Sequence, residues 1–249
     1  MTLTERTLYN YFDKNAFTTR NIDLPRKVKY KPRKKSTTSV TKDYNYRIWR
    51  TFSDFVKFIE DNPNTTIVEI DTVHGTRSGK VLLIFIFRNC SLMIAFIIDS
   101  CSELDVKEAI DKRYEVLGHE EFKRYFPVIL TDNRSEFKDP ESLELDNEGN
   151  QRTKIFYCNP MDSYQKPYVE KNHEYIRYII PKGTSLNNRT QEEITLMMNH
   201  INNTARASLN GNTPFKLAQM LLDNSLLDKL SLKYIPTDEI HLKPALFKK

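Results

Sequence analysis

The sequence lacks the short motifs that identify several large enzyme classes. It has no G-x-G-x-x-G turn, no Walker loop, no G-x-S-x-G turn and no His and Cys cluster with zinc spacing. We therefore expect no nucleotide cofactor and no serine or cysteine nucleophile. Three cysteines, Cys90, Cys101 and Cys158, form no C-x-x-C pair, and their odd number argues against a complete disulfide framework. A reducing cytoplasm fits this usage, and no basic-then-apolar leader precedes Thr2.

The length and the charge set broad limits on the protein. A chain of 249 residues can bury a large core in one domain, with room for a small appendage. The formal net charge of +5 makes the chain compatible with a polyanionic partner such as nucleic acid, without proving one.

Residues 1–42 are expected to form an arm outside the core. Within it, residues 26–35 hold seven cations and no acid, and Pro25 and Pro32 exclude a helix interior. The cations are Arg26, Lys27, Lys29, Lys31, Arg33, Lys34 and Lys35. Such a run is often a solvated linker. The alternative is that the arm lies along a DNA backbone, with Tyr30 available for stacking, and binds with an affinity that falls with salt.

Two short apolar segments each deliver an acid. Residues 66–73 form a β-branched run that carries Asp71, and residues 128–130 lead directly to Asp132. Further on, Glu170 opens a helical stretch. Three converging carboxylates repel one another without a metal, and such oxygens suit Mg²⁺ or Mn²⁺. The alternative is that each is an ordinary acid at a strand end or helix start, where solvation and the helix dipole favour it.

Two continuous apolar runs, residues 81–87 and 92–98, could be mistaken for one membrane helix. Arg88 and the polar residues 89–91 interrupt them, and an arginine in the middle of a span is costly in lipid. The β-branched and aromatic content instead predicts two buried strands joined by a tight turn. Another strand is expected at residues 154–157.

Helical periodicity is found in several segments. The first, from Ser53 to about residue 61, should cover a sheet edge with Phe55, Val56, Ile59 and the preceding Phe52. The second, at residues 103–117, should turn Leu104, Ile110, Tyr114 and Leu117 inward and end at Gly118. Further helices are expected from Glu170, at 190–201 and at 214–222, with a short one between 137 and 148. Residues 159–169 are expected to be a loop, and 226–249 a tail that packs on the core or on a second copy.

An ordered series of segments resembles the bacterial insertion-sequence transposases of the IS-thirty type. The matching segments are residues 71–75, 130–137, 156–160, 165–166, 170–173, 176–178, 181–183 and 208–211. The resemblance implies an α/β fold: a ribonuclease-H-like core, with a mixed five-stranded sheet flanked by helices, a basic N-terminal arm and a helical C-terminal region. In that fold the first and fourth strands are adjacent, which would bring Asp71 beside Asp132. The family's catalytic Asp-Asp-Glu triad then falls on Asp71, Asp132 and Glu170.

The resemblance also implies the function. It implies a DNA transposase, a polynucleotidyl transferase that uses two Mg²⁺ or Mn²⁺ ions held by the triad to cleave and join strands at insertion-element ends. Double-stranded DNA, both element ends and target, would be the partner of a homo-oligomer, in the bacterial cytoplasm and with the nucleoid, without a membrane. The implied organisation is a helix-turn-helix remnant at 1–16, a basic linker at 17–47, the integrase catalytic core at 48–222 and a tail at 223–249.

Several other residues of the core are candidates for roles in this site. On the helix from Glu170, His173, Glu174 and Arg177 share its face, and Glu174 is the rival for the third acid. Candidate phosphate contacts are Lys166, Arg177 and Lys182, although a surface salt bridge explains such a cation equally well. Candidate supporting residues are Asn133, Asn172 and His173.

Two departures from the family pattern motivate an alternative. Arg134 stands where relatives usually have glycine, which would permit a left-handed backbone; an arginine there would be strained, would compete with a metal or would hold a DNA phosphate. Relatives also carry a complete helix-turn-helix region, of which only residues 5–12 are recognisable, as its last helix. The alternative function is an impaired, truncated transposase that binds DNA or sequesters intact transposase in mixed oligomers.

Overall fold

The computed structural model describes residues 4–19, 45–76, 78–160 and 162–247, without the side chains of Ser163 and Glu170. The chain divides into two compact units, Met1–Lys42 and Asp43–Lys249. In the first unit, the segment expected to be a helix is α1 (Glu5–Asp13), and the Thr4 side chain accepts a hydrogen bond from the Thr7 main-chain nitrogen at its start. The cations of residues 26–35 lie outside the described residues.

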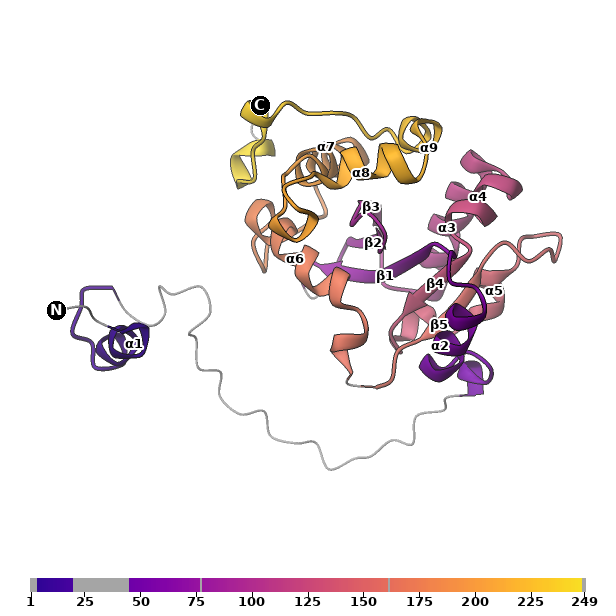
Figure 1. The fold of residues 1–249 in the computed structure, drawn as a ribbon, viewed down its shortest axis with the longest axis horizontal. Coiled ribbons are helices and arrows are strands. Elements are labelled where there is room, and N and C mark those ends of the chain that lie inside the picture. Colours follow the sequence, from indigo (N-terminus) through magenta and orange to yellow (C-terminus); the bar gives the residue numbers. More distant parts are fainter. Residues whose placement is uncertain (1–3, 20–44, 77, 161, 248–249) are drawn as a thin grey trace. The chain divides into compact units, whose positions relative to one another are not determined.

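A five-stranded mixed sheet forms the centre of the second unit (Figure 1). Its strands are β1 (Ile67–His74), β2 (Val81–Phe87), β3 (Met93–Ile98), β4 (Val128–Thr131) and β5 (Lys154–Tyr157), in the spatial order β3-β2-β1-β4-β5. The first three strands are antiparallel, and β4 is parallel to both β1 and β5. This arrangement is the ribonuclease-H-like fold, as predicted, with the first and fourth strands adjacent.

The two long apolar runs are the buried strands β2 and β3, and not a membrane helix. Every residue of β2 is buried, because helices cover both faces of the sheet. A tight turn joins β2 to β3, with Ser91 in the left-handed region at φ 57°. Within the described residues, none of the helices has the length and apolar character that crossing a bilayer requires.

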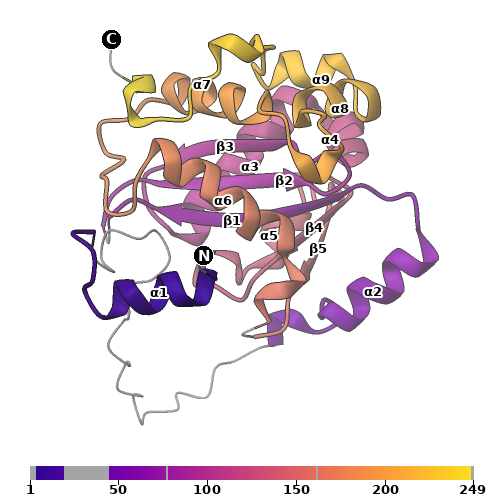
Figure 2. The same cartoon turned by 60° about the vertical axis from the view of Figure 1, so that its left-hand side comes forward.

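Helices lie on both faces and at one edge of the sheet. In Figure 2, α6 crosses one face, with α7 and α8 beside it, while α3 lies behind the strands. At the β5 edge of the sheet, α2 packs on β5, where the rings of Phe55 and Phe156 are 5.7 Å apart. The described helices are α2 (Phe52–Asp61), α3 (Glu103–Leu117), α4 (His119–Tyr125), α5 (Pro140–Glu144), α6 (Pro167–Ile179), α7 (Gln191–Asn202), α8 (Pro214–Leu221) and α9 (Asn224–Lys229). Short 3₁₀ turns are η2 (Asn45–Arg47), η3 (Ser135–Phe137), η4 (Ser163–Gln165), η5 (Ala207–Leu209), η6 (Thr237–Glu239) and η7 (Pro244–Phe247).

Local sequence explains where several of these helices begin. Reciprocal capping boxes start α2 at Thr51 and Asp54, and α7 at Thr190 and Glu193, so that free N–H groups of the first turn are satisfied. At its end α3 meets Gly118, whose φ of 78° is accessible to glycine. The bounds predicted for α3 are confirmed, and α2 begins at Phe52, one residue before its predicted start.

Some sequence-based expectations were wrong. Val56 and Leu104 were expected to face inward, but they are 39% and 64% exposed. Val106 and Ala109 take the inward positions of α3. The expected loop at 159–169 contains η4 and the first turn of α6, because Pro167 fits the first helical position, where its missing N–H costs nothing.

Candidate active site

The register of the sheet brings Asp71 and Asp132 together. In the parallel ladder between β1 and β4, Val68 pairs with Ile129 and Glu69 with Leu130. Continuing this register by two residues places Asp71 opposite Asp132. β4 ends at Thr131, whereas β1 continues beyond Asp71 along β2, so Asp71 lies inside a strand and not at its end. Asp71 is 6% exposed.

Lys166 shows that the two carboxylates converge. Its Nζ lies 3.8 Å from Oδ2 of Asp71 and 3.6 Å from Oδ2 of Asp132, and it donates to the carbonyl oxygen of Ile70 at 3.1 Å. Only 8% of the Lys166 side chain is exposed. One ammonium group therefore occupies a position from which a cation reaches both acids. The side chain predicted to contact DNA phosphate is buried against the acids.

Arg134 contacts the same two acids from the solvent side. Its Nη1 lies 3.3 Å from Oδ1 of Asp71, and its Nε lies 3.1 Å from Oδ2 of Asp132. The backbone of Arg134 has φ −73° and ψ 158°, an ordinary extended conformation. The expectation of a left-handed, strained backbone at this position was therefore wrong. Replacing glycine by arginine changes the charge of the site instead.

Helix α6 is attached to β1 through a buried acid that sequence reasoning missed. Oε2 of Glu69 accepts a hydrogen bond from the main-chain nitrogen of Val169 at 2.8 Å, and its Oε1 accepts from Nε of Arg88 at 2.7 Å. Glu69 and Asp71 are two residues apart, so they leave β1 on the same face. The only sign of this contact in the sequence was Glu69 itself, an acid two residues before Asp71 in the alternating pattern of β1.

His173 extends the site one turn along α6. Its Nε2 lies 3.8 Å from Oδ2 of Asp71, and this buried atom has no hydrogen-bond partner among the described residues. Burial lowers the pKa of His173, although Asp71 opposes the effect. At neutral pH the imidazole is therefore neutral and has an unused ring nitrogen beside Asp71.

The third predicted acid is placed only by its backbone. Glu170 follows Val169 in α6, one helical turn before His173, and its side chain lies outside the described part of the chain. The side chains that the structure describes contain no group of three His, Cys, Asp or Glu residues arranged to hold a metal. The rival Glu174 is exposed.

Burial and charge have opposite effects on Asp132. Its pKa is raised because burial disfavours the charged form, while Lys166 counteracts this and Asp71 adds to it. Cationic side chains lie against both carboxylates, an arrangement that suits a cation-binding site.

The other predicted residues lie around this centre. Asn133 donates to the carbonyl oxygen of Cys158 at 2.7 Å, and Asn172 donates to that of Tyr168 at 2.6 Å and accepts from Arg206. Arg177 donates from Nη2 to the carbonyl oxygen of His74 at 3.0 Å, and Lys182 is exposed.

A hydrogen-bonded group below Arg134 was also missed. Nη1 of Arg134 donates to the Thr72 hydroxyl at 2.8 Å, and that hydroxyl lies 2.8 Å from Oε1 of the buried Glu136, to which it donates. The Cys101 thiol donates to the same oxygen at 2.9 Å. Burial and Glu136 raise the pKa of Cys101 to about 12, so this thiol is not a nucleophile. Only the folded arrangement brings these residues together.

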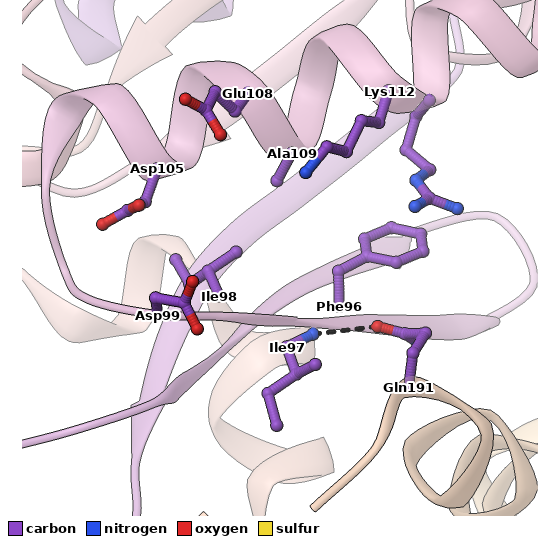
Figure 3. A pocket seen from close by; sticks show the side chains of 10 residues that line it. Phe96, Ile97, Ile98, Asp99, Asp105, Glu108, Ala109, Lys112 and Gln191 are labelled. Carbon is purple, nitrogen blue, oxygen red and sulfur yellow. Dashed lines mark hydrogen bonds between the residues drawn. The ribbon is translucent and has the colours of Figure 1, made fainter. Parts of the chain in front are cut away.

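A separate pocket of about 240 Å³ lies between β3 and α3 (Figure 3). Gln191 reaches its edge and accepts from the main-chain nitrogen of Ile97 at 3.0 Å. Asp99, Asp105 and Glu108 contribute acids, and Lys112 and Arg113 contribute cations. Neither Asp71 nor Asp132 lines this pocket, so it is distinct from the candidate site.

Known proteins with similar sequences are transposases and an integrase. No family model matches the chain. A putative integrase, ORF3 of Spiroplasma virus SpV1-R8A2 B, is 26% identical over 147 residues, which are 59% of this chain and 44% of that protein. The transposase for insertion sequence element IS4351 of Bacteroides fragilis is 29% identical over 162 residues, or 64% of this chain and 46% of the relative. The matched part thus spans less than half of either relative.

A shorter match bears directly on the resemblance noted in the sequence. Transposase InsI for insertion sequence element IS30A of Escherichia coli strain K12 is 32% identical over 66 residues, or 26% of this chain and 17% of that protein. The resemblance to IS-thirty-type transposases is confirmed. Among solved structures, the catalytic core domain of BIV integrase aligns with 61% of this chain and 91% of its own, at 17% identity and a TM-score of 0.42. The simian T-cell lymphotropic virus intasome in complex with PP2A regulatory subunit B56 gamma aligns with 61% of this chain and 53% of its own, at 13% identity and a TM-score of 0.43.

Proposed function

We propose that the chain is a DNA transposase that cleaves and joins DNA strands with the help of divalent metal ions. The observation that carries the proposal is the convergence of Asp71 and Asp132 on one cation position, occupied by Nζ of Lys166. Relatives that are transposases and an integrase support the reaction class. Double-stranded DNA is the proposed substrate, and the basic residues 26–35 are a proposed backbone contact.

The residues of the site fit divalent metal ions. Carboxylate oxygens suit Mg²⁺ and Mn²⁺, and both aspartates already direct oxygens at shared cations. The unpartnered Nε2 of His173 beside Asp71 is a further polar atom without a present role. Asp71 and Asp132 would hold the ions together with Glu170, whose position in α6 follows Val169. When bound, such ions would stabilise the charge that develops on a transferring phosphate.

The chain's own residues position this chemistry. The hydrogen bond from Val169 to Glu69 ties the start of α6, which carries Glu170, to β1, which carries Asp71. Lys166 places its ammonium group between the two aspartates, 3.8 Å from Oδ2 of Asp71 and 3.6 Å from Oδ2 of Asp132. Arg177, attached to the carbonyl oxygen of His74, and the exposed Lys182 are proposed contacts for DNA phosphates. We also propose that the protein acts as a homo-oligomer on DNA in the cytoplasm, because joining two element ends needs two sites.

The test is the nicking and joining of supercoiled plasmid DNA in Mn²⁺, which requires no knowledge of the element ends. We expect the wild-type chain to nick the plasmid and both Asp71→Asn and Asp132→Asn to lose at least about 100-fold in rate, equivalent to roughly 2.7 kcal/mol of barrier. A gel-shift assay with the same DNA checks that the variants still bind. If the wild type and Asp71→Asn were equally inert while both bound DNA, the chain would be a DNA-binding or sequestering protein instead.

A further inference from the structure

The side chain of Arg134 occupies the oxygens that a metal ion would need. Its guanidinium lies across Asp71 and Asp132 at 3.3 Å and 3.1 Å, and its main-chain nitrogen donates to Oδ1 of Asp132 at 3.2 Å. Nζ of Lys166 lies within 4 Å of Oδ2 of Asp71. It also lies within 4 Å of Oδ2 of Asp132, the oxygen that Nε of Arg134 contacts. The two positive side chains therefore balance the two negative ones. A divalent ion gains its binding energy from these same oxygens, so at least one internal cation has to leave.

The two cations differ in how easily they can leave. Lys166 is 8% exposed and is anchored by its hydrogen bond to the carbonyl oxygen of Ile70. Arg134 is 44% exposed and stands between β4 and η3 with an unstrained backbone. A long, half-exposed side chain can rotate into solvent without disturbing the core, whereas a buried ammonium cannot. Arg134 is the displaceable cation.

A dedicated acceptor holds Arg134 in this position. Besides the acids, Nη1 donates to the Thr72 hydroxyl at 2.8 Å and to the Thr72 carbonyl oxygen at 3.1 Å. The hydroxyl is oriented by its own hydrogen bond to Glu136. Thr72 can therefore be changed to weaken the hold on Arg134 without removing either acid or the arginine itself.

We propose that Arg134 is an exchangeable counter-ion of the candidate active site: it covers Asp71 and Asp132 in the metal-free protein, and metal binding transfers it to a phosphate of the bound DNA. A planar guanidinium suits phosphate oxygens as well as carboxylates, so the released side chain has a partner of matching geometry. The inference rests on the proposed function, because it takes the two aspartates as metal-binding residues. It assigns Arg134 a positioning role at the DNA backbone.

Competition between Arg134 and the metal for the two aspartates is tested by measuring Mn²⁺ binding to the full chain without DNA by electron paramagnetic resonance. We expect Arg134→Ala to bind Mn²⁺ about tenfold more tightly than the wild type, a difference of roughly 1.4 kcal/mol. Thr72→Val should show a smaller change in the same direction. Arg124→Ala, which removes the same charge from an exposed position on α4, is the matched control and should bind like the wild type.

The outcomes separate this inference from the proposed function. Equal affinity of wild type and Arg134→Ala, with binding lost in Asp71→Asn, would overturn the counter-ion role and leave the metal site intact. If neither the wild type nor Arg134→Ala bound Mn²⁺ while circular dichroism showed both folded, the proposed function would fail together with the inference.

The transfer of Arg134 to a DNA phosphate is tested by the salt dependence of DNA binding. With Ca²⁺ as the divalent ion and a short duplex of arbitrary sequence, the slope of log affinity against log salt should be less steep in Arg134→Ala by about 0.9, the value for one phosphate contact. With EDTA in place of Ca²⁺, the slopes of variant and wild type should coincide, because Arg134 is then engaged by the aspartates. Identical slopes in Ca²⁺ would overturn the transfer to phosphate.

Discussion

Oε2 of Glu69 accepts a hydrogen bond from the main-chain nitrogen of Val169 across 2.8 Å, which joins the middle of β1 to the first turn of α6. The N-cap residue of α6, Lys166, makes no capping hydrogen bond through its side chain, so this acid from another element takes that role. A carboxylate at a helix N-terminus is also favoured by the helix dipole. Because Val169 directly precedes Glu170, the contact ties the backbone next to the third predicted acid to β1.

Glu69→Ala should therefore destabilise the protein and loosen α6. It removes a fully buried carboxylate that binds both Val169 and Arg88, so we expect a loss of about 3 kcal/mol in the free energy of unfolding. Urea unfolding gives the stability, and amide hydrogen exchange of α6 reports the local opening. Glu60→Ala, at an exposed position on α2, is the control and should change the stability by less than about 0.5 kcal/mol.

The strands of the sheet could be predicted from local patterns, whereas the pairing of its two central acids was predicted from the family resemblance. The β-branched and apolar runs at 81–87 and 92–98 are strands with nearly the predicted bounds. The helix expected at 190–201 is α7, and its buried residues include Ile194, Met197, Met198 and Ile201. Once the family resemblance suggested that the first and fourth strands were adjacent, the proximity of Asp71 and Asp132 followed.

The contacts that shape the site could not be predicted, because they join residues distant in sequence. Nothing local indicates that Lys166 is buried against Ile70, or that Glu69 caps a helix a hundred residues later. The burial of a single apolar residue could not be predicted either. Leu104 is exposed, since an apolar residue in the first turn of a helix need not face the core. The backbone of Arg134 was misjudged because a glycine in relatives does not by itself prove a positive φ.

The third acid can be identified by comparing two glutamates of α6. We expect Glu170→Gln to lower plasmid nicking by at least about 100-fold and to weaken Mn²⁺ binding, whereas Glu174→Gln, one helical turn further along the face, should stay within about twofold. Both substitutions keep the size and helix propensity of the side chain, so a fold defect is not expected. If Glu174→Gln were the inactive variant, the third acid would be Glu174 and the family correspondence would shift by one turn.

Gly75 marks a close approach between the end of β1 and the loop after α6. A Cβ atom at this position would lie 2.1 Å from the carbonyl oxygen of Thr184, and the Gly75 carbonyl oxygen accepts from the Gly183 nitrogen at 3.1 Å. Gly75→Ala should therefore cost about 2 kcal/mol in the free energy of unfolding, measured in urea. The comparison is Gly149→Ala, which meets no atom within 4 Å but has φ 84° and should cost about 1 kcal/mol. A smaller loss for Gly75→Ala than for Gly149→Ala would contradict the steric argument.

His200 should make the protein less stable as the pH falls below neutrality. Its side chain is buried, and Nδ1 accepts a hydrogen bond from the main-chain nitrogen of His241 at 3.2 Å, which requires that nitrogen to be unprotonated. Burial, together with the nearby charge of His241, lowers the pKa of His200, while Glu239 opposes the shift. The unfolded chain binds a proton at a pKa of about 6.5, so between that value and the lower folded pKa the unfolded state holds more protons and stability drops with falling pH.

His200→Asn keeps an acceptor near the Nδ1 position but does not titrate. Urea unfolding of the wild type and His200→Asn at pH 7.5 and pH 5.5 should show a smaller pH-dependent loss of stability in the variant. Equal losses in both proteins would mean that other groups, such as the half-buried His173, carry the acid sensitivity.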